Sequence, residues 1–204
     1  MHTEIFNKNQ LELLSHLKVF NRSFYLVGGT AIALYLGHRR SIDFDLFSYT
    51  PLVKHRLKKK LINIPYQQIP IYEDVDQLHL IINNVKITFF HYPYQVIHSQ
   101  KTERLFSMPS LLSLAAMKAF ALGRRAKWKD YVDLYYILKY HFSIEEISKE
   151  CEKIFGNQYA EKLFRQQLAF HDDIDFSESV EFMNNPINEK EINEFLIEKA
   201  IQFI

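Results

Sequence analysis

The sequence predicts an α+β fold in which a strand-rich first half is followed by a helical second half. Short β-rich runs occur up to residue 90, whereas apolar residues repeat at helical spacing after residue 105. The stretch between them, residues 91–102, is irregular and contains Pro93. We therefore predict two domains, residues 1–104 and residues 105–204.

The first elements form a predicted strand–helix–strand unit behind an N-terminal helix. Apolar residues at helical spacing predict a helix over residues 3–19, with Thr3 as a candidate N-cap. The apolar run 24–27 has strand character and stops at two glycines. A helix of Ala, Leu and Ile residues follows them, and residues 42–47 form the second strand of the unit.

Two aspartates on this second strand share one face. Alternate residues of a strand project from the same side, so Asp43 and Asp45 lie about 7 Å apart along it. Two neighbouring carboxylates repel each other unless a cation lies between them, and Mg²⁺ prefers oxygen ligands of this kind. The pair is therefore a candidate metal site, with Mg²⁺ as the expected ion and Mn²⁺ as the alternative.

The paired glycines supply a candidate phosphate site. Because Gly28 and Gly29 lack a Cβ, backbone N–H groups can approach a ligand closely, and the following helix directs its positive end at the same point. Thr30 can cap that helix or offer its hydroxyl to a phosphate. Each motif alone is more often structural. Together, a metal site and a phosphate site indicate a nucleoside triphosphate.

Four more elements are predicted in the remainder of the first half. Pro51 can open a helix that extends to residue 62, whose lysines either form a solvated surface or contact RNA. A short strand over residues 66–69 lies between two prolines, near a sheet edge. A hairpin joins strands 78–82 and 85–90 across two asparagines.

The second half is predicted to consist of helices. The first opens near Pro109 and ends at Gly123, and Ser143 forms a capping box with Glu146 at the start of the third. The other helices cover residues 127–140, 158–170 and 188–203.

The composition is that of a globular protein with little overall charge. The 204 residues carry a formal net charge of +1, so attraction to nucleic acid must come from local basic patches. Cys151 is the only cysteine, which fits a reducing compartment and a small core residue. The sequence contains no signal-peptide pattern and no apolar run long enough to cross a membrane. We therefore expect a cytoplasmic protein without a membrane partner.

The motifs of the strand–helix–strand unit resemble a known signature. Their order is similar to the minimal nucleotidyltransferase signature of the polymerase-β superfamily, and more narrowly to the AbiEii/AbiGii toxin family of bacterial abortive-infection and toxin–antitoxin pairs. The resemblance implies a polymerase-β-like mixed sheet with flanking helices, followed by a helical bundle. The residues that carry it are Gly28, Gly29, Thr30, His38, Arg39, Ser41, Asp43 and Asp45.

A second block supports the narrower family. Residues Lys118, Ala121, Arg125, Asp130 and Asp133 resemble its downstream Lys…Arg…Asp-x-x-Asp-Leu motif. From spacing alone, the two aspartates share a helix face, and a salt-bridge lattice between antiparallel helices is the simpler interpretation. The resemblance implies instead that the lysine and one aspartate complete the site.

The reaction that the resemblance implies is transfer of a nucleoside monophosphate from an NTP to an acceptor hydroxyl, with release of pyrophosphate. Arg39 could bind phosphate or pair with Asp43, and His38 is expected to be a structural helix cap. The candidates for nucleotide binding are Gly28, Gly29, Thr30, Arg39, Ser41 and Arg125.

The catalytic candidates come from both blocks: Asp43, Asp45, Lys118 and Asp130. Lys118 would contact the phosphates or the leaving pyrophosphate, and Asp130 is the candidate general base. Asp133 would orient that base or hold its helix in place.

Two questions leave alternatives open: whether the chain lacks the third carboxylate of polymerase-β-like enzymes, and which molecule accepts the nucleotide. Polymerase-β-like enzymes often carry a third carboxylate on a later strand, where this chain has Lys86 and Thr88. The protein could therefore be a catalytically impaired relative that only binds nucleotide or a partner. Among acceptors, relatives suggest the 3′ end of tRNA, and a protein modified by adenylylation is the rival. A cognate antitoxin is the expected protein partner, and a helical module whose acidic C-terminal part binds a basic partner is a further alternative.

Overall fold

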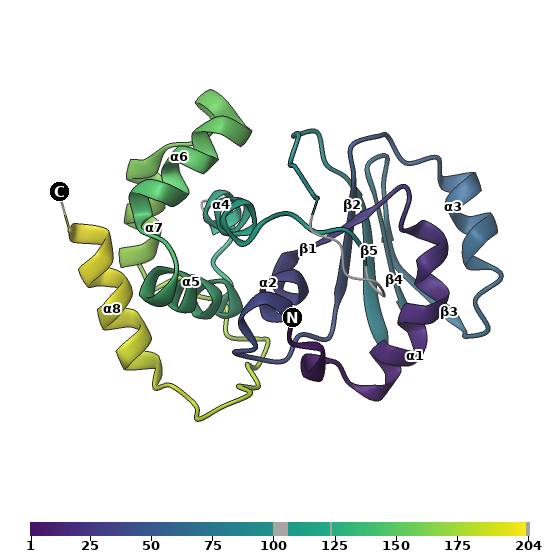
Figure 1. Ribbon diagram of the computed structural model, residues 1–204, viewed down its shortest axis with the longest axis horizontal. Helices are drawn as coiled ribbons and strands as arrows, with labels where there is room; N and C mark the ends of the chain where they lie inside the picture. Colours follow the sequence, from purple (N-terminus) through teal and green to yellow (C-terminus); the bar gives the residue numbers. More distant parts are fainter. Residues whose placement is uncertain (100–105, 123, 203–204) are drawn as a thin grey trace.

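The computed structural model describes residues 1–99, 106–122 and 124–202, and it confirms the α+β class (Figure 1). Within these ranges, five strands form one mixed sheet, and helices lie on both sides of it. The expected domain boundary near residue 105 and the expected helix end at Gly123 lie outside the described residues. The two predicted domains therefore stay a prediction.

The sheet has the strand order β1-β2-β5-β4-β3. Its central pair, β2 (Phe44–Ser48) and β5 (Val85–His91), is parallel. The remaining strands, β1 (Tyr25–Val27), β4 (Gln77–Ile82) and β3 (Gln68–Glu73), pair antiparallel with their neighbours. The mixed sheet places β1 and β3 at its two edges.

The hairpin prediction is confirmed, and the prediction for the edge strand needs a correction. Asn83 and Asn84 have φ angles of 51° and 61°, as a two-residue hairpin turn requires. The edge strand was expected to end before Pro70, but β3 continues through it. Proline is tolerated there because β3 is an edge strand whose register shifts between Pro70 and Tyr72.

The strand that carries the two acids begins later than expected. β2 starts at Phe44, so Asp43 directly precedes the strand and Ile42, which is 51% exposed, does not face the core. The β1–β2 pairing does not extend this far, because its register ends with Val27 opposite Asp45. The two acids therefore lie where the pairing between β1 and β2 ends.

Two helices cover one side of the sheet, α1 (Lys8–Leu17) and α3 (Lys54–Leu61) (Figure 1). The expected N-cap at Thr3 is wrong, because that residue lies in a short 3-10 turn. The cap is Asn7, whose side chain forms a capping box with Gln10. A capping box satisfies two N–H groups at once, which explains why the helix begins there.

Three helices lie on the other side of the sheet (Figure 1): α2 (Gly28–Leu36), α4 (Leu111–Leu122) and α5 (Trp128–Tyr140). They pack against one another, and α2 contacts both α4 and α5. α2 ends at Gly37, whose φ of +62° is the left-handed conformation of a glycine cap. The cap is therefore Gly37, and the expectation that His38 fills this role is wrong.

Three further helices complete the second half: α6 (Ile144–Phe155), α7 (Glu161–Ala169) and α8 (Glu189–Ile201). The predicted capping box of α6 is confirmed, since Ser143 and Glu146 bond each other's backbone N–H groups. α7 begins three residues later than expected, because a 3-10 turn precedes it.

Cys151 lies in the core, as expected. It is buried in α6, and its thiol contacts the backbone oxygen of Ala116 in α4 at 3.4 Å. None of the described helices has the length and apolar character needed to cross a lipid bilayer.

The chain between α7 and α8 returns to the first half. We call residues 174–183 the return segment. It forms one bridge with the start of α5, between Lys127 and Asp175, and another with the loop before β2, between Arg39 and Phe182. The return segment therefore ties the two halves of the chain together beside the acids.

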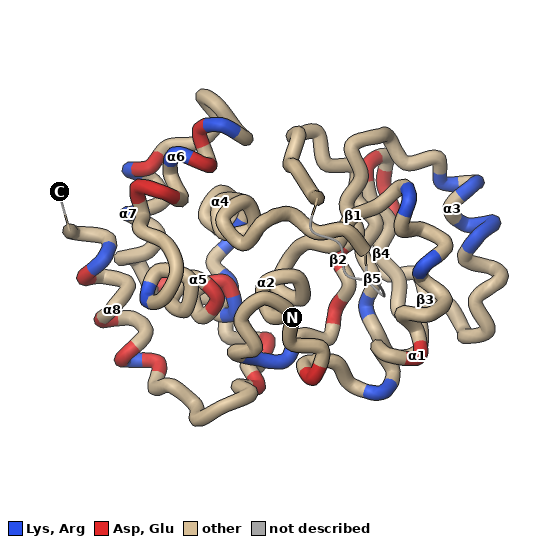
Figure 2. The backbone as a smooth tube through the Cα atoms, in the orientation of Figure 1, with Lys and Arg blue, Asp and Glu red and all other residues tan. Residues whose placement is uncertain are grey.

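The charged residues of α3 are all basic, whereas α6 and α8 carry acidic and basic residues together (Figure 2). Most of the basic residues of α3 are exposed, and Lys58 pairs with Glu73 at 2.7 Å. Acidic residues of the return segment also find partners within the chain, as Glu181 does with Arg40 at 2.6 Å. The acidic C-terminal part is thus partly neutralised internally.

Candidate active site

Asp45 lies directly against the glycine bend that joins β1 to α2. A Cβ atom on Gly28 would stand 2.2 Å from Asp45 Oδ2, and the φ of Gly28 is +71°. Both observations restrict this position to glycine. The strand register pairs Val27 with Asp45. It therefore holds the carboxylate beside the start of α2, where the first N–H groups have no partner within the helix.

Replacing Gly28 with alanine is expected to abolish the nucleotide transfer that the sequence motifs predict, because the new Cβ would displace Asp45. Gly156 provides a matched control, since its φ is +54° and nothing lies within 4 Å of its Cβ position. Both variants carry backbone strain of about 1–3 kcal/mol. Thermal unfolding should therefore show a loss of stability in both, whereas a transfer assay should show a loss of activity in Gly28→Ala alone. Full activity in Gly28→Ala would contradict this role of the bend.

The environment disfavours two negative charges at the acids. Burial raises the pKa of Asp43, and the charge of Asp45 raises it further. Burial also raises the pKa of Asp45, against the opposing charges of Arg125 and Lys118. These cations come from the second half of the chain, so the two sequence blocks meet at the acids. A cation between the carboxylates would relieve their repulsion.

The residues present fit a magnesium ion that is shared with a substrate. In the described part of the chain, no group of three or more His, Cys, Asp or Glu side chains is placed to hold a metal. Mg²⁺ commonly takes one or two protein carboxylates and completes its coordination with substrate phosphates and water. Asp43 and Asp45 match that requirement, and the glycine bend lies directly beside Asp45.

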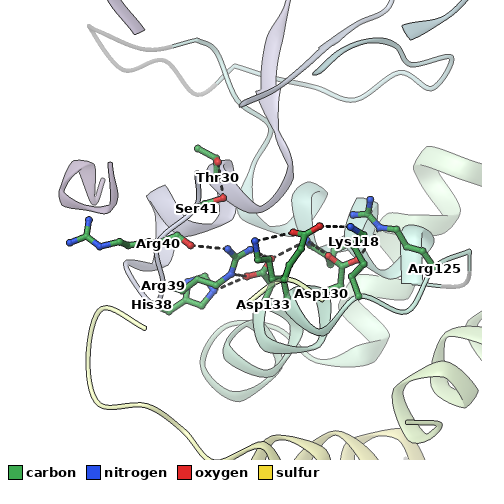
Figure 3. A network of polar contacts seen from close by, with 12 residues as sticks. Thr30, His38, Arg39, Arg40, Ser41, Lys118, Arg125, Asp130 and Asp133 are labelled. Carbon is green, nitrogen blue, oxygen red and sulfur yellow. Dashed lines mark hydrogen bonds and ion pairs between the residues drawn. The ribbon is translucent and has the colours of Figure 1, made fainter. Parts of the chain in front are cut away.

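Asp133 is the centre of a buried network that joins the two halves (Figure 3). Arg39 Nε and Nη2 donate to its Oδ1 and Oδ2 at 2.7 and 2.9 Å. His38 Nε2 lies 2.8 Å from Oδ1, and Lys118 Nζ lies 2.9 Å from Oδ2. Burial would raise the pKa of Asp133, but these partners hold it well below its usual range. These partners therefore hold Asp133 in its carboxylate form.

Lys118 extends this network to Asp130 and Arg125 (Figure 3). Its Nζ lies 2.7 Å from Asp130 Oδ1, and Arg125 Nε donates to Asp130 Oδ2 at 3.0 Å. Burial alone would lower the pKa of Lys118, but Asp130 and Asp133 raise it above its usual value. Lys118 is therefore held as a cation close to Asp45. The predicted salt-bridge lattice and the predicted approach of Lys118 to the first block are both present.

Arg39 takes a different place from the two that the sequence suggested. It pairs with Asp133 and not with Asp43, and its side chain is 2% exposed. A Cβ on Gly29 would stand 2.4 Å from Arg39 Nη2. The absence of a Cβ on Gly29 therefore leaves room for the buried guanidinium of Arg39, which packs against the glycine bend.

Thr30 and Ser41 connect the start of α2 to the approach of β2. The Thr30 hydroxyl contacts Ser41 Oγ at 2.8 Å and also bonds the backbone oxygen of Asp43. The N-cap of α2 is Val27, so Thr30 does not cap the helix. Gln10 Nε2 donates to the backbone oxygen of Ser41 at 2.7 Å. These contacts fix the position of Asp43.

Sequence reasoning missed the charged residues that the fold brings close to Asp43. Lys86 and Lys129 both lower the pKa of Asp43. Lys129 Nζ lies 2.9 Å from Glu178, which also pairs with Lys127, and these lysines lower the pKa of Glu178 to about 2. No local pattern indicates these contacts. Lys86 reaches Asp43 through the β2–β5 pairing, and Glu178 reaches Lys129 through the docking of the return segment.

Comparisons with known proteins give a family and a fold. The family described as nucleotidyl transferase AbiEii toxin, type IV TA system, matches residues 12–103 and 64–201. An uncharacterized protein of Aquifex aeolicus is 28% identical over 170 residues, which are 81% of this chain and 82% of the relative.

Two solved structures are similar in fold. MenT4, a nucleotidyltransferase toxin from Mycobacterium tuberculosis, matches with a TM-score of 0.62 at 13% identity over 94% of this chain and 80% of that one. An H. pylori protein assigned as a nucleotidyltransferase matches with a TM-score of 0.51 at 14% identity, over 94% of this chain and 91% of that one.

Proposed function

Because the chain belongs to the AbiEii nucleotidyltransferase toxin family of type IV toxin–antitoxin systems, we propose that it transfers a nucleoside monophosphate to the 3′ hydroxyl of an RNA. The fold match to a nucleotidyltransferase toxin agrees with this family. The family also implies an NTP substrate and an antitoxin partner. The acceptor we propose first is tRNA, with Mg²⁺ as the metal.

The observation that carries the proposal is that two aspartates, a glycine bend and two cationic side chains lie close together. Asp43 and Asp45 supply oxygen ligands beside the positive end of α2. Lys118 and Arg125 supply positive charge on the other side of Asp45. A triphosphate needs both, because charge builds up on its oxygens as the phosphoryl group is transferred.

In the proposed reaction, the acceptor oxygen bonds to the α-phosphorus and the bond to the β-phosphate oxygen breaks. Pyrophosphate leaves with the electron pair of that bond, next to Lys118. A magnesium ion held by Asp43 and Asp45 would offset negative charge on the phosphates. The N–H groups at Gly28 and Gly29 would orient the triphosphate beside it.

Asp130 is the proposed acceptor of the hydroxyl proton, and the structure adds a condition to this role. Both of its oxygens are paired, one with buried Lys118 and one with Arg125. The Arg125 side chain is 53% exposed, so it is the partner that can leave. We propose that Arg125 moves onto the phosphates when NTP binds and frees one oxygen of Asp130 for the proton.

Incubation of the purified protein with Mg²⁺ and each labelled NTP should label bulk tRNA. The four nucleotides are tested separately, and chelation of the metal should stop the reaction. Labelling of a protein band without RNA would show that the acceptor is a protein. No labelling at all, with measurable NTP binding, would support the alternative of a catalytically impaired relative that only binds nucleotide.

A further inference from the structure

The sheet carries a row of side chains that leads away from the acids. The β2–β5 register places Asp45 opposite Thr88. The next two pairings place Thr88 opposite His79, and His79 opposite Tyr72. Directly paired residues project from the same face, and neighbouring strands lie about 4.8 Å apart. The row therefore extends from Asp45 to the edge strand, over about 14 Å.

A second row runs parallel to the first. Lys86 is paired with Ile81, and Ile81 with Ile69. One residue beyond the recorded β2–β5 register, Lys86 stands beside Asp43. The two rows together form what we call the platform: Thr88, His79, Tyr72, Lys86, Ile81 and Ile69.

Away from Thr88, which is buried beside Asp45 at 8% exposure, the platform is the less covered face of this half of the sheet. The alternate residues of β4 on the opposite face, Leu78, Leu80 and Ile82, are at most 4% exposed. On the platform side, His79 and Ile81 are half-buried. At the edge strand, Tyr72 is 49% exposed and Ile69 is 48% exposed. Lys86 is also exposed.

We propose that the platform binds the unpaired 3′ end of the acceptor RNA by base stacking, and so directs its terminal hydroxyl to the acids. This inference rests on the proposed function. The chemistry of the face favours a single-stranded end, because exposed aromatic rings stack with bases of any sequence and a nearby lysine can pair with the backbone phosphates.

The two rings are held in place for such contacts. The Tyr72 and His79 rings meet edge to face, with centroids 5.7 Å apart and planes at 90°. Tyr72 Oη donates to Asp74 Oδ2 at 2.9 Å, and His79 Nε2 lies 2.8 Å from Gln77 Oε1. Burial and the charge of Lys86 lower the pKa of His79, which keeps the ring neutral at pH 7. Ordered rings lose little conformational entropy on binding.

The test compares two RNA hairpins that share one stem, one with a short unpaired 3′ tail and one with a flush end. The wild-type protein should prefer the tailed hairpin. Tyr72→Ala should raise KM for the tailed RNA about tenfold with kcat nearly unchanged, since one stacked base contributes on the order of 1–3 kcal/mol. Tyr72→Phe keeps the ring and should behave as wild type.

Tyr140→Ala is the matched control, because Tyr140 is also exposed, at 61%, but lies at the far end of α5. Binding of the tailed RNA without NTP, followed by fluorescence anisotropy, should weaken in Tyr72→Ala and His79→Ala and stay unchanged in Tyr140→Ala. Lys86→Met should reduce the salt dependence of this binding. Thermal unfolding of each variant verifies that it is folded.

The outcomes separate the two proposals. If the wild-type protein labels RNA but Tyr72→Ala and His79→Ala bind and label the tailed hairpin as wild type does, the platform is overturned and the transferase proposal stands. If no RNA is labelled while the two variants still lose binding of the tailed hairpin, the platform stands and the proposed reaction fails. Equal use of the tailed and flush hairpins by the wild-type protein would also overturn the platform.

Discussion

Asp45→Asn is expected to lower nucleotide transfer by more than about a thousandfold, because a metal-binding carboxylate supports several kcal/mol of charge stabilisation in the transition state. The fold should be retained. Asp45 raises the pKa of Asp43 through repulsion, so its neutralisation removes an unfavourable interaction. The unfolding temperature without metal should therefore be equal to or above that of the wild-type protein.

The stability measurement also tests the metal site separately from turnover. Mg²⁺ together with NTP should raise the unfolding temperature of the wild-type protein, as any ligand of the native state does, and should do so less for Asp45→Asn. Asp172→Asn is the matched control, since it removes an exposed carboxylate. A variant that transfers nucleotide at the wild-type rate would refute the assignment of Asp45 as a metal ligand.

Asp133→Ala is expected to destabilise the protein by about 3–5 kcal/mol, because it leaves the buried guanidinium of Arg39 without its counter-charge and removes one of the two carboxylates that pair with Lys118. Arg39 and Lys118 are 2% and 6% exposed, so water cannot replace the lost carboxylate. Urea unfolding of the variant against the wild-type protein measures the difference. Asp173→Ala, which removes an exposed carboxylate, should change stability by less than about 0.5 kcal/mol.

The pH dependence of stability tests the contribution of Asp133 in a second way. The pKa of Asp133 is lowered in the folded state from its usual 3.8, so its contribution to stability is complete above this pH and is lost as the pH falls below it. The stability difference between the wild-type protein and Asp133→Ala should therefore shrink on acidification below pH 3.8. A difference below about 1 kcal/mol at neutral pH would show that the network is not needed for folding.

The features that could be predicted from the sequence are those with a local physical cause. The hairpin follows from Asn83 and Asn84, which accept positive φ angles, and the α6 start follows from a capping box. The approach of Asp45 to the glycine bend follows from two short strands that flank one helix. The approach of Lys118 to Asp130 needed only two consecutive helices.

Features that depend on distant parts of the chain could not be predicted in this way. The partners of Asp133 include Arg39, which is 94 positions away, and nothing in either segment marks the pair. The same holds for Glu178, whose contact with Lys129 depends on the docking of the return segment. The sequence also suggested a phosphate-binding role for Arg39, because an exposed and a buried arginine cannot be distinguished by spacing.

The connection through Asp133 has a consequence for the protein while it is being synthesised. On the ribosome, the segment with both acids emerges well before α5 and the return segment. Until those later residues leave the exit tunnel, the guanidinium of Arg39 has no counter-charge, and Lys118 has no aspartate to hold it beside the acids. A nascent chain therefore contains both acids before the active site is assembled, and a toxin built in this way becomes competent only after α5 and the return segment have left the exit tunnel.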